Sequence, residues 1–230
     1  MKPLVINCER RRRITHDDTG SGLPLVISPA IAYIFDMTFT RRSLLPIFVL
    51  VPAALLLPCQ AAGADEKIWD LLRQGGQVVA IRHTQTTQGF GDPPGFKLDD
   101  CATQRNLNDE GRAQARNMGA AFRERGVPIA AVISSPWCRC LETARLAFGE
   151  AESWSALSNL YGRPQNEAHQ SRAMRERISG FRGPGNLVLV SHGVTIRAAT
   201  GTYLSMGDFV VLTPRGSGRF DVVGTITVDR

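Results

Sequence analysis

The sequence predicts an α/β fold, a three-layer α/β/α sandwich in which helices cover both faces of a mostly parallel sheet. Short apolar runs at residues 77–81, 129–133 and 187–190 have the composition of buried strands. Amphipathic stretches separate these runs, and that alternation is typical of parallel strands joined by helices. Two more strand-like runs, at residues 209–212 and 219–228, flank a Gly-rich turn. They predict a C-terminal hairpin.

The N-terminal region is predicted to direct export rather than to form a domain. Arg41 and Arg42 precede an apolar run at residues 44–58, which is short for a membrane span. Ala62-Gly63-Ala64 then has the small residues of a signal-peptide cleavage site. We expect a periplasmic or secreted protein that contacts the membrane only through this segment. The expected divisions are a non-structural extension at residues 1–36, a signal peptide at 37–64 and a domain at 65–230.

Alternatives stay open for this region. Translation that begins at Met37 would make the upstream residues a start-site artefact, which is the interpretation we favour. A true extension would place residues 23–35 and 44–57 on or in the membrane. Leu56 to Cys59 also resembles a lipoprotein cleavage site, although Pro58 stands where a small residue is expected.

The remaining elements of the domain follow in chain order. Residues 68–72 predict a short helix, and a loop rich in glycine and proline at residues 89–95 follows the first strand. Asn108 is placed to cap a helix that extends to Arg125. The other predicted helices lie at about residues 138–148, 171–178 and 195–203, with an irregular segment at 149–170.

The charge distribution limits the classes of partner. The chain has a formal net charge of +6, but arginines at residues 10–13, 41 and 42 account for much of it. The predicted domain is therefore only mildly basic, too little to indicate nucleic-acid binding. A local excess of arginine can still attract a phosphate dianion.

Candidate chemistry follows each of the three buried strands. Arg82 and His83 end the first strand, Arg139 follows the second and His192 ends the third. Parallel strands bring their carboxyl ends to one edge of the sheet, where binding sites form. A neutral imidazole is a competent nucleophile near pH 7, and guanidinium groups match the geometry of phosphoryl oxygens. The pattern predicts a phosphoryl-transfer site that requires no metal or cofactor.

These motifs resemble the histidine phosphatase superfamily, also called phosphoglycerate mutase-like. Arg82-His83-Thr84 is similar to the family's Arg-His-Gly/Ala motif, and residues 134–144 resemble its Ser-Ser-x-x-x-Arg-x-x-x-Thr-Ala segment. Ser191-His192-Gly193 resembles the segment that carries the second pocket histidine. Residues 105–111 resemble the segment that opens the first long helix. The resemblance extends from about Gln77 to the C-terminus and implies a phosphoglycerate mutase-like fold.

The resemblance also implies catalytic roles. His83 would be phosphorylated, while Arg82, Arg139 and His192 would stabilise the transferring group. A phosphate dianion beside His192 would favour the protonated, cationic form of that ring.

Three positions depart from the family pattern or stay ambiguous. Thr84 replaces a small residue, so that its hydroxyl could bind substrate or fill space. Arg105 is balanced between lining the pocket and anchoring the loop. Glu167 is the candidate proton donor, although a surface position is the simpler interpretation. A substrate with a good leaving group would need little protonation.

The cysteines allow several arrangements. Cys101, Cys138 and Cys140 lie in the predicted domain, whereas Cys8 and Cys59 precede it. In an oxidising compartment, we expect a disulfide between Cys101 and either Cys138 or Cys140. A zinc site and three free buried thiols are the alternatives.

The function predicted from these observations is hydrolysis of a phosphomonoester, on a small or cell-envelope phosphorylated substrate. The protein would be a monomer or dimer that does not bind nucleic acid. A phosphohistidine phosphatase of a phosphoprotein is the enzymatic alternative, and export counts against it. A non-catalytic pseudo-phosphatase that binds phosphorylated ligands is the non-enzymatic one.

Overall fold

The computed structural model describes residues 61–228. The predicted extension at residues 1–36 lies outside the described residues, as do Cys8, Cys59 and the signal peptide up to residue 60. Within the described part of the chain, no helix combines the length and the hydropathy needed to span a membrane.

A six-stranded mixed sheet forms the centre of the domain, in the order β3-β2-β4-β1-β5-β6. The strand β1 pairs in parallel with β4, which in turn pairs in parallel with β2. On its other side β1 pairs antiparallel with β5, and β5 continues into β6 as the predicted hairpin. The strands are β1 (Val78–Arg82), β2 (Ile129–Ser134), β3 (Glu152–Ser153), β4 (Asn186–Ser191), β5 (Asp208–Gly216) and β6 (Arg219–Thr227).

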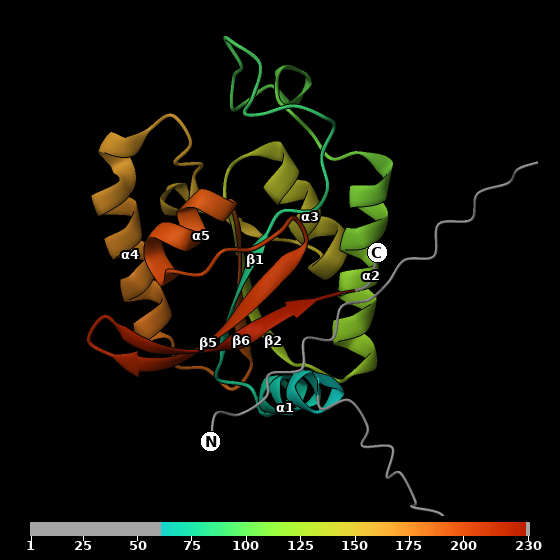
Figure 1. Cartoon of the computed structure of the whole chain (residues 1–230), viewed down its shortest axis with the longest axis vertical. Helices are drawn as coiled ribbons and strands as arrows, with labels where there is room; N and C mark the ends of the chain where they lie inside the picture. The colour runs from blue at the N-terminus through green and yellow to red at the C-terminus, as the bar shows by residue number, and fades with distance from the viewer. Residues whose placement is uncertain (1–60, 229–230) are drawn as a thin grey trace, which may run out of the picture. The chain divides into compact units, whose positions relative to one another are not determined.

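Helices cover both faces of this sheet, so the predicted three-layer architecture is confirmed (Figure 1). Side chains of α1, α2 and α3 share one buried cluster with one face, where Trp69 packs on Phe122 and Phe209. Side chains of α4 and α5, including Met174 and Ile196, share a second cluster with the other face. The helices are α1 (Ala61–Gln74), α2 (Asp109–Glu124), α3 (Cys138–Phe148), α4 (Glu167–Gly180) and α5 (Gly193–Thr200).

Successive residues of β4 alternate between the two clusters, as the pleat of a strand requires. Val188 and Val190 belong to the cluster beneath α1 to α3, whereas Leu187 and Leu189 belong to the cluster beneath α4 and α5. All six residues of β4 are buried. This explains why the sequence of the strand is a continuous apolar run rather than an alternating one.

The start of α2 follows the predicted cap. The Asn108 side chain accepts a hydrogen bond from the backbone N–H of Gly111 at 2.8 Å, which satisfies one of the free donors of the first turn. A Cβ atom at residue 111 would lie 1.9 Å from the carbonyl oxygen of Gln85. Glycine at this position therefore lets α2 begin directly against the end of β1.

Two helices are longer than predicted, for one physical reason. The helix α1 begins at Ala61 rather than near residue 68, and α4 begins at Glu167 rather than at residue 171. Residues 63–67 and 167–169, near the starts of these helices, are exposed, and Gln170 is the one buried residue ahead of the predicted start of α4. Exposed turns have no apolar periodicity, so the pattern marked only the buried part of each helix.

The strands β2 and β3 differ from expectation more clearly. We predicted that the run at residues 129–133 is fully buried, but only Ile133 and Ser134 of β2 are buried. Its outer neighbour β3 is two residues long and covers only that end of β2. The sequence did not predict β3, because two residues are too few to show a strand pattern.

Candidate active site

The carboxyl edge of the sheet brings the two predicted histidines together. His83 follows β1 and His192 follows β4, and these strands are parallel with Arg82 opposite Ser191. The ring centroids of the two histidines are 5.5 Å apart. A cavity of about 250 Å³ opens at this edge, and it is lined by His83, His192, Arg82, Arg105 and Arg139 among others.

The surroundings of His83 fix the form of its imidazole. Its Nδ1 atom lies 2.9 Å from the backbone oxygen of Thr84. A carbonyl oxygen only accepts, so Nδ1 carries the hydrogen and Nε2 carries the lone pair. Burial first, and then the charge of Arg139, lower the pKa of His83 to about 3. The ring is therefore neutral near pH 7, the form that a nucleophile needs.

Three of the arginines that line the cavity have a buried Nε–H group without a partner. The Nε atoms of Arg82, Arg105 and Arg139 are buried without a hydrogen-bond partner. A buried donor that lacks a partner is costly, so each of these positions favours a nearby acceptor. Their terminal nitrogens donate to protein acceptors, namely the oxygen of Leu204 (2.8 Å), Thr86 Oγ1 (2.6 Å) and the Asp92 carboxylate (2.6 and 3.2 Å).

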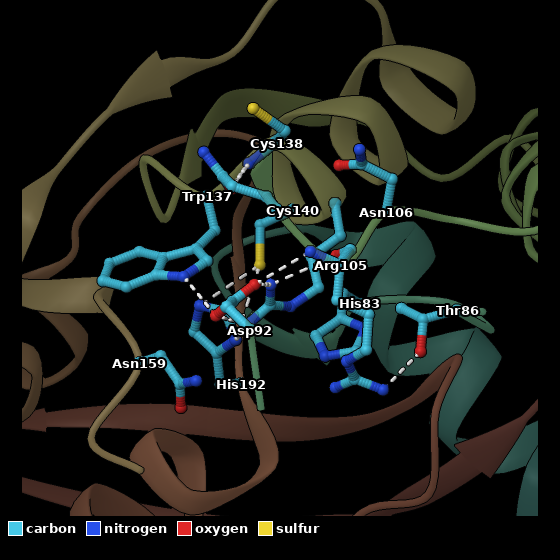
Figure 2. A network of polar contacts seen from close by, with 12 residues as sticks. His83, Thr86, Asp92, Arg105, Asn106, Trp137, Cys138, Cys140, Asn159 and His192 are labelled. Carbon is cyan, nitrogen blue, oxygen red and sulfur yellow. Dashed lines mark hydrogen bonds and ion pairs between the residues drawn. The ribbon is translucent and has the colours of Figure 1, made fainter. Parts of the chain in front are cut away.

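Asp92 is the residue of this site that the sequence did not reveal. Its carboxylate accepts hydrogen bonds from both terminal nitrogens of Arg139, and both side chains are almost fully buried. It also accepts hydrogen bonds from Trp137 Nε1 at 3.0 Å and from the backbone N–H of Arg105 at 3.1 Å. Figure 2 shows Asp92 between Trp137 and Arg105.

The carboxyl group of Asp92 is held in its ionised form. Burial is the largest single influence and would raise its pKa, but the hydrogen bonds and charge of Arg139 outweigh burial, and the pKa is lowered. An ionised carboxylate bonded on both oxygens is not a proton donor. Asp92 acts instead on the orientation of Arg139, and through Arg105 and Trp137 it joins the loop after β1 to the segment that begins α3.

His192 is also neutral, and both ring nitrogens contact the protein. Nδ1 lies 3.5 Å from Arg139 Nη2, which can only donate, so Nε2 carries the hydrogen that points to Ser135 Oγ at 2.9 Å. Burial, then Arg139 and His83, lower the pKa of His192 well below its usual value. The cationic form of His192 that we expected is thus disfavoured here, and a bound dianion would have to stabilise it.

The other predicted residues have different outcomes. Arg105 does what both interpretations proposed, since it lines the cavity and also donates from Nη1 to the carbonyl oxygen of Gly89 at 3.2 Å. Thr84 does not line the cavity, so the prediction that it binds substrate is corrected. It is fully buried, and its hydroxyl lies 3.1 Å from Thr143 Oγ1 on α3.

Glu167, the candidate proton donor, is not brought to the site. It is the first residue of α4, where its side chain is exposed, and it is not one of the residues that line the cavity. The helix directs its inner face toward the core through Gln170, Met174 and Ile178, which leaves position 167 toward solvent. The surface interpretation of Glu167 is the one that the structure supports.

A disulfide joins the long loop to the helix that carries Arg139. Cys101 is bonded to Cys138, 37 residues further along the chain. Cys140 is free and buried, and burial raises the pKa of its thiol to about 12. The zinc alternative is wrong, because two of its sulfurs form this disulfide. Among residues 61–228, no group of three His, Cys, Asp or Glu side chains is placed to hold a metal ion.

Fold and site together define an α/β protein with an anion site at the carboxyl edge of its sheet. Residues 78–160 match the model of the histidine phosphatase superfamily (branch 1). The match includes Arg82, His83 and Arg139, whereas His192 lies beyond it. This match points to phosphatase activity and does not specify a substrate.

Solved structures with similar chains include several phosphatases. An alpha-ribazole phosphatase from Shigella flexneri is 14% identical with a TM-score of 0.47, over 64% of this chain and 94% of that one. A phosphoserine phosphatase from Entamoeba histolytica is 14% identical with a TM-score of 0.49, over 66% and 96% of the two chains. The protein histidine phosphatase SixA, complexed with tungstate, is 17% identical with a TM-score of 0.44, over 66% and 96%. No match to a curated protein sequence was found.

Proposed function

We propose that this protein hydrolyses phosphomonoesters through a phosphohistidine formed at His83. One observation carries the proposal. A neutral imidazole with a free Nε2 lone pair lines the same cavity as three arginines, each with a buried and unpaired Nε–H. A phosphoryl group supplies both the electrophile for that lone pair and the oxygens for those donors.

The proposed hydrolysis has two steps. In the first, the lone pair of His83 Nε2 forms a bond to phosphorus while the bond from phosphorus to the ester oxygen breaks. The alcohol leaves and takes its proton from water. In the second, water attacks phosphorus, the phosphorus–nitrogen bond breaks, and the lone pair returns to Nε2 with release of inorganic phosphate. Arg82, Arg105 and Arg139 stabilise the equatorial oxygens in both steps, and no step requires a metal ion.

The test is hydrolysis of p-nitrophenyl phosphate, together with acid-quench trapping of the phosphorylated protein. His83→Ala should lose several orders of magnitude in kcat and form no phosphoprotein, because a nucleophile has no substitute. His169→Asn is the matched control, since His169 is an exposed histidine on α4 away from the cavity. Equal activity in wild type and His83→Ala would overturn the assignment of the nucleophile.

A phosphate-binding protein without turnover remains the second candidate. It is favoured by the position of Glu167, the candidate proton donor, which is exposed and does not line the cavity. Measured affinity for inorganic phosphate without trapped phosphoprotein or product would favour this candidate. A burst of phosphohistidine followed by turnover would exclude it.

We also propose that the protein is exported, which makes a small or cell-envelope phosphorylated compound the expected substrate. The charge and apolar pattern of residues 37–64 supports export. The disulfide supports it as well, because such bonds persist in oxidising compartments. N-terminal sequencing of protein from the periplasmic fraction should give Asp65 as the first residue. An intact N-terminus in the cytosolic fraction would contradict the proposal.

A further inference from the structure

Exposed apolar side chains gather at the mouth of the cavity. Phe90 is 95% exposed, Tyr203 72%, Tyr161 56% and Val194 43%, and all four line the cavity whose floor holds His83. Single exposed apolar residues are ordinary on protein surfaces. Four around one opening give it an apolar character, which is typical of a ligand-binding site. We call these four residues the apolar mouth.

The apolar mouth is built from separate segments that the fold holds in place. Phe90 belongs to the loop after β1, and Arg105 holds this loop through the carbonyl oxygen of Gly89. Gly91, beside Phe90, packs against the Tyr161 ring, since a Cβ there would lie 3.3 Å from the ring. The loop is fastened a second time by the Cys101–Cys138 disulfide. These contacts restrain the backbone that carries Phe90, which lowers the entropy that binding must remove.

The charged side chains that line the cavity are all arginines, so their charge is positive. Arg197 on α5 lines the cavity beside Val194, and its side chain is exposed. Within residues 61–228 it has neither an ion-pair partner nor a hydrogen bond from its guanidinium. The cavity therefore offers Arg82, Arg105 and Arg139 for a phosphate, and it offers Arg197 as a further cation.

We propose that the ligand of this cavity is a small phosphomonoester that carries a flat apolar ring next to the phosphate, with a second anionic group on the far side of the ring. The ring lies against Phe90, Tyr161 and Tyr203, and the second anionic group meets Arg197. The placement of the phosphate over His83 rests on the proposed function. The cavity volume of about 250 Å³ lies just below the usual range of small-molecule sites, so the ligand is expected to be small.

Binding of phosphonates tests the apolar mouth without catalysis. The probes are benzylphosphonate and methylphosphonate, which share the anionic head and differ in the ring, with affinities measured by calorimetry on the whole protein. Benzylphosphonate should bind about 10-fold more tightly or better, because the ring is removed from water. Phe90→Ala and Tyr203→Ala should each reduce that preference about 3- to 10-fold. They should leave the affinity for methylphosphonate unchanged.

Leu98→Ala is the matched control, because Leu98 is another exposed apolar residue of the same loop and does not line the cavity. It should bind both probes as the wild type does. Equal affinities for the two probes in the wild type would overturn the inference. So would a ring preference that survives both mouth variants.

A second pair of probes tests Arg197. The compound 4-carboxybenzylphosphonate should bind more tightly than benzylphosphonate, by about 3-fold or more, and Arg197→Gln should abolish this difference. Arg219→Gln, at an exposed arginine of β6 away from the cavity, should retain it. An unchanged difference in Arg197→Gln would overturn the anionic part of the inference.

These outcomes can be separated from failure of the proposed function. If His83→Ala retains full hydrolytic activity, the phosphohistidine mechanism fails, while the phosphonate affinities still report on the mouth. If hydrolysis depends on His83 but the ring confers no preference, the mechanism stands and the substrate class is wrong.

Discussion

His83 is neutral because it is both buried and surrounded by cations. Removal from water disfavours the imidazolium form, and Arg139, Arg82 and Arg105 repel a further positive charge. The same arginines that would receive the phosphate therefore keep the nucleophile in its reactive form. The hydrogen bond from Nδ1 to the Thr84 oxygen orients the ring, so that the free lone pair is on Nε2.

The lowered pKa of His83 predicts a pH dependence of stability. Between about pH 3 and the ordinary histidine value of 6.5, the unfolded chain binds a proton at His83 that the folded protein does not bind. Stability therefore falls as the pH is lowered through this range, by about 1.4 kcal/mol per pH unit from this residue. His83→Asn should reduce the slope by that amount in denaturant unfolding at pH 6, 5 and 4. Parallel curves for the two proteins would contradict the lowered pKa.

Asp92 should contribute more to stability than a surface carboxylate does. Asp92→Ala leaves the buried Arg139 charge without its partner, so we expect the free energy of unfolding at pH 7 to fall by about 3–5 kcal/mol. Asp221→Ala is the control, because Asp221 pairs with Arg215 on an exposed surface and should lose about 1 kcal/mol or less.

The effect of Asp92 should also depend on pH with a definite sign. The folded-state pKa of Asp92 is lowered, so its stabilisation is complete above the unfolded value of 3.8 and is lost as the pH falls below it. The difference between wild type and Asp92→Ala, measured by denaturant unfolding, should therefore be constant from pH 7 to 5 and shrink below pH 4. A difference that grows toward acid would contradict the ionised state of Asp92.

The residues that sequence reasoning identified are those next to buried strands. Arg82, His83 and His192 could be placed because strand ends are visible as breaks in apolar runs. Asp92 could not, since it lies in a loop of glycine and proline where no spacing relates it to Arg139, 47 residues away. The prediction that Glu167 is the proton donor was wrong, because the sequence does not show which face of its helix points to the site.

At the scale of elements, α2 and α3 approach each other through a glycine. A Cβ atom at Gly119 would lie 2.1 Å from the carbonyl oxygen of Ala147, at the end of α3. Only glycine allows this approach, and α3 in turn carries Arg139 at its start. The spacing between the two helices thus contributes to the position of a site residue about two turns away.

Gly119→Ala should therefore destabilise the protein despite the better helix propensity of alanine. We expect a loss of about 1–3 kcal/mol, because backbone must move to relieve the clash. Gly180→Ala is the matched change, at a helical glycine whose Cβ would meet nothing within 4 Å, and it should be neutral or stabilise by up to about 1 kcal/mol. Thermal unfolding of the two variants distinguishes them. Equal melting temperatures would mean that α2 and α3 separate at no cost.

The elements that the sequence predicted well are those with a buried face and a clear boundary. The start of α2 was visible because Asn108 caps it, and β1 and β4 because they are buried on both faces. The exposed first turn of α4 and the two-residue β3 have no such signal. Tertiary neighbours, rather than local sequence, decide where these elements begin.

At the scale of the whole molecule, the strand order could not be predicted from the sequence. The α/β class follows from local patterns, but the position of β5 beside β1 depends on pairing between Val78 and Leu212. The antiparallel direction of that pair was also invisible, since the sequence shows the hairpin but not the strand it joins. Long-range pairing is a property of the assembled core.

The disulfide should stabilise the domain and should also restrain the loop that carries Asp92 and Arg105. It closes a chain segment of 37 residues, for which the chain-entropy model gives about 4 kcal/mol. The double variant Cys101→Ser, Cys138→Ser should lose roughly that stability in denaturant unfolding. Its KM for p-nitrophenyl phosphate should rise, because the loop that bears Asp92 and Arg105 is less restrained.

Dithiothreitol supplies the control for this prediction. It should shift the wild type toward the behaviour of the double variant and leave the double variant unchanged. If reduction alters both proteins equally, the effect does not come from this bond.

The position of β1 in the sheet has a consequence for the order of events after synthesis. Both partners of the nucleophile strand lie far downstream, since Val78 pairs with Leu187 and with Leu212. A nascent chain cannot complete β1, or bring His83 to His192, until nearly its full length has emerged. Folds with such distant pairings form slowly. If the protein is exported as we propose, its chain would remain unfolded, and thus able to pass through a translocation pore, for longer than a domain of local contacts. The candidate site would then form only after translocation.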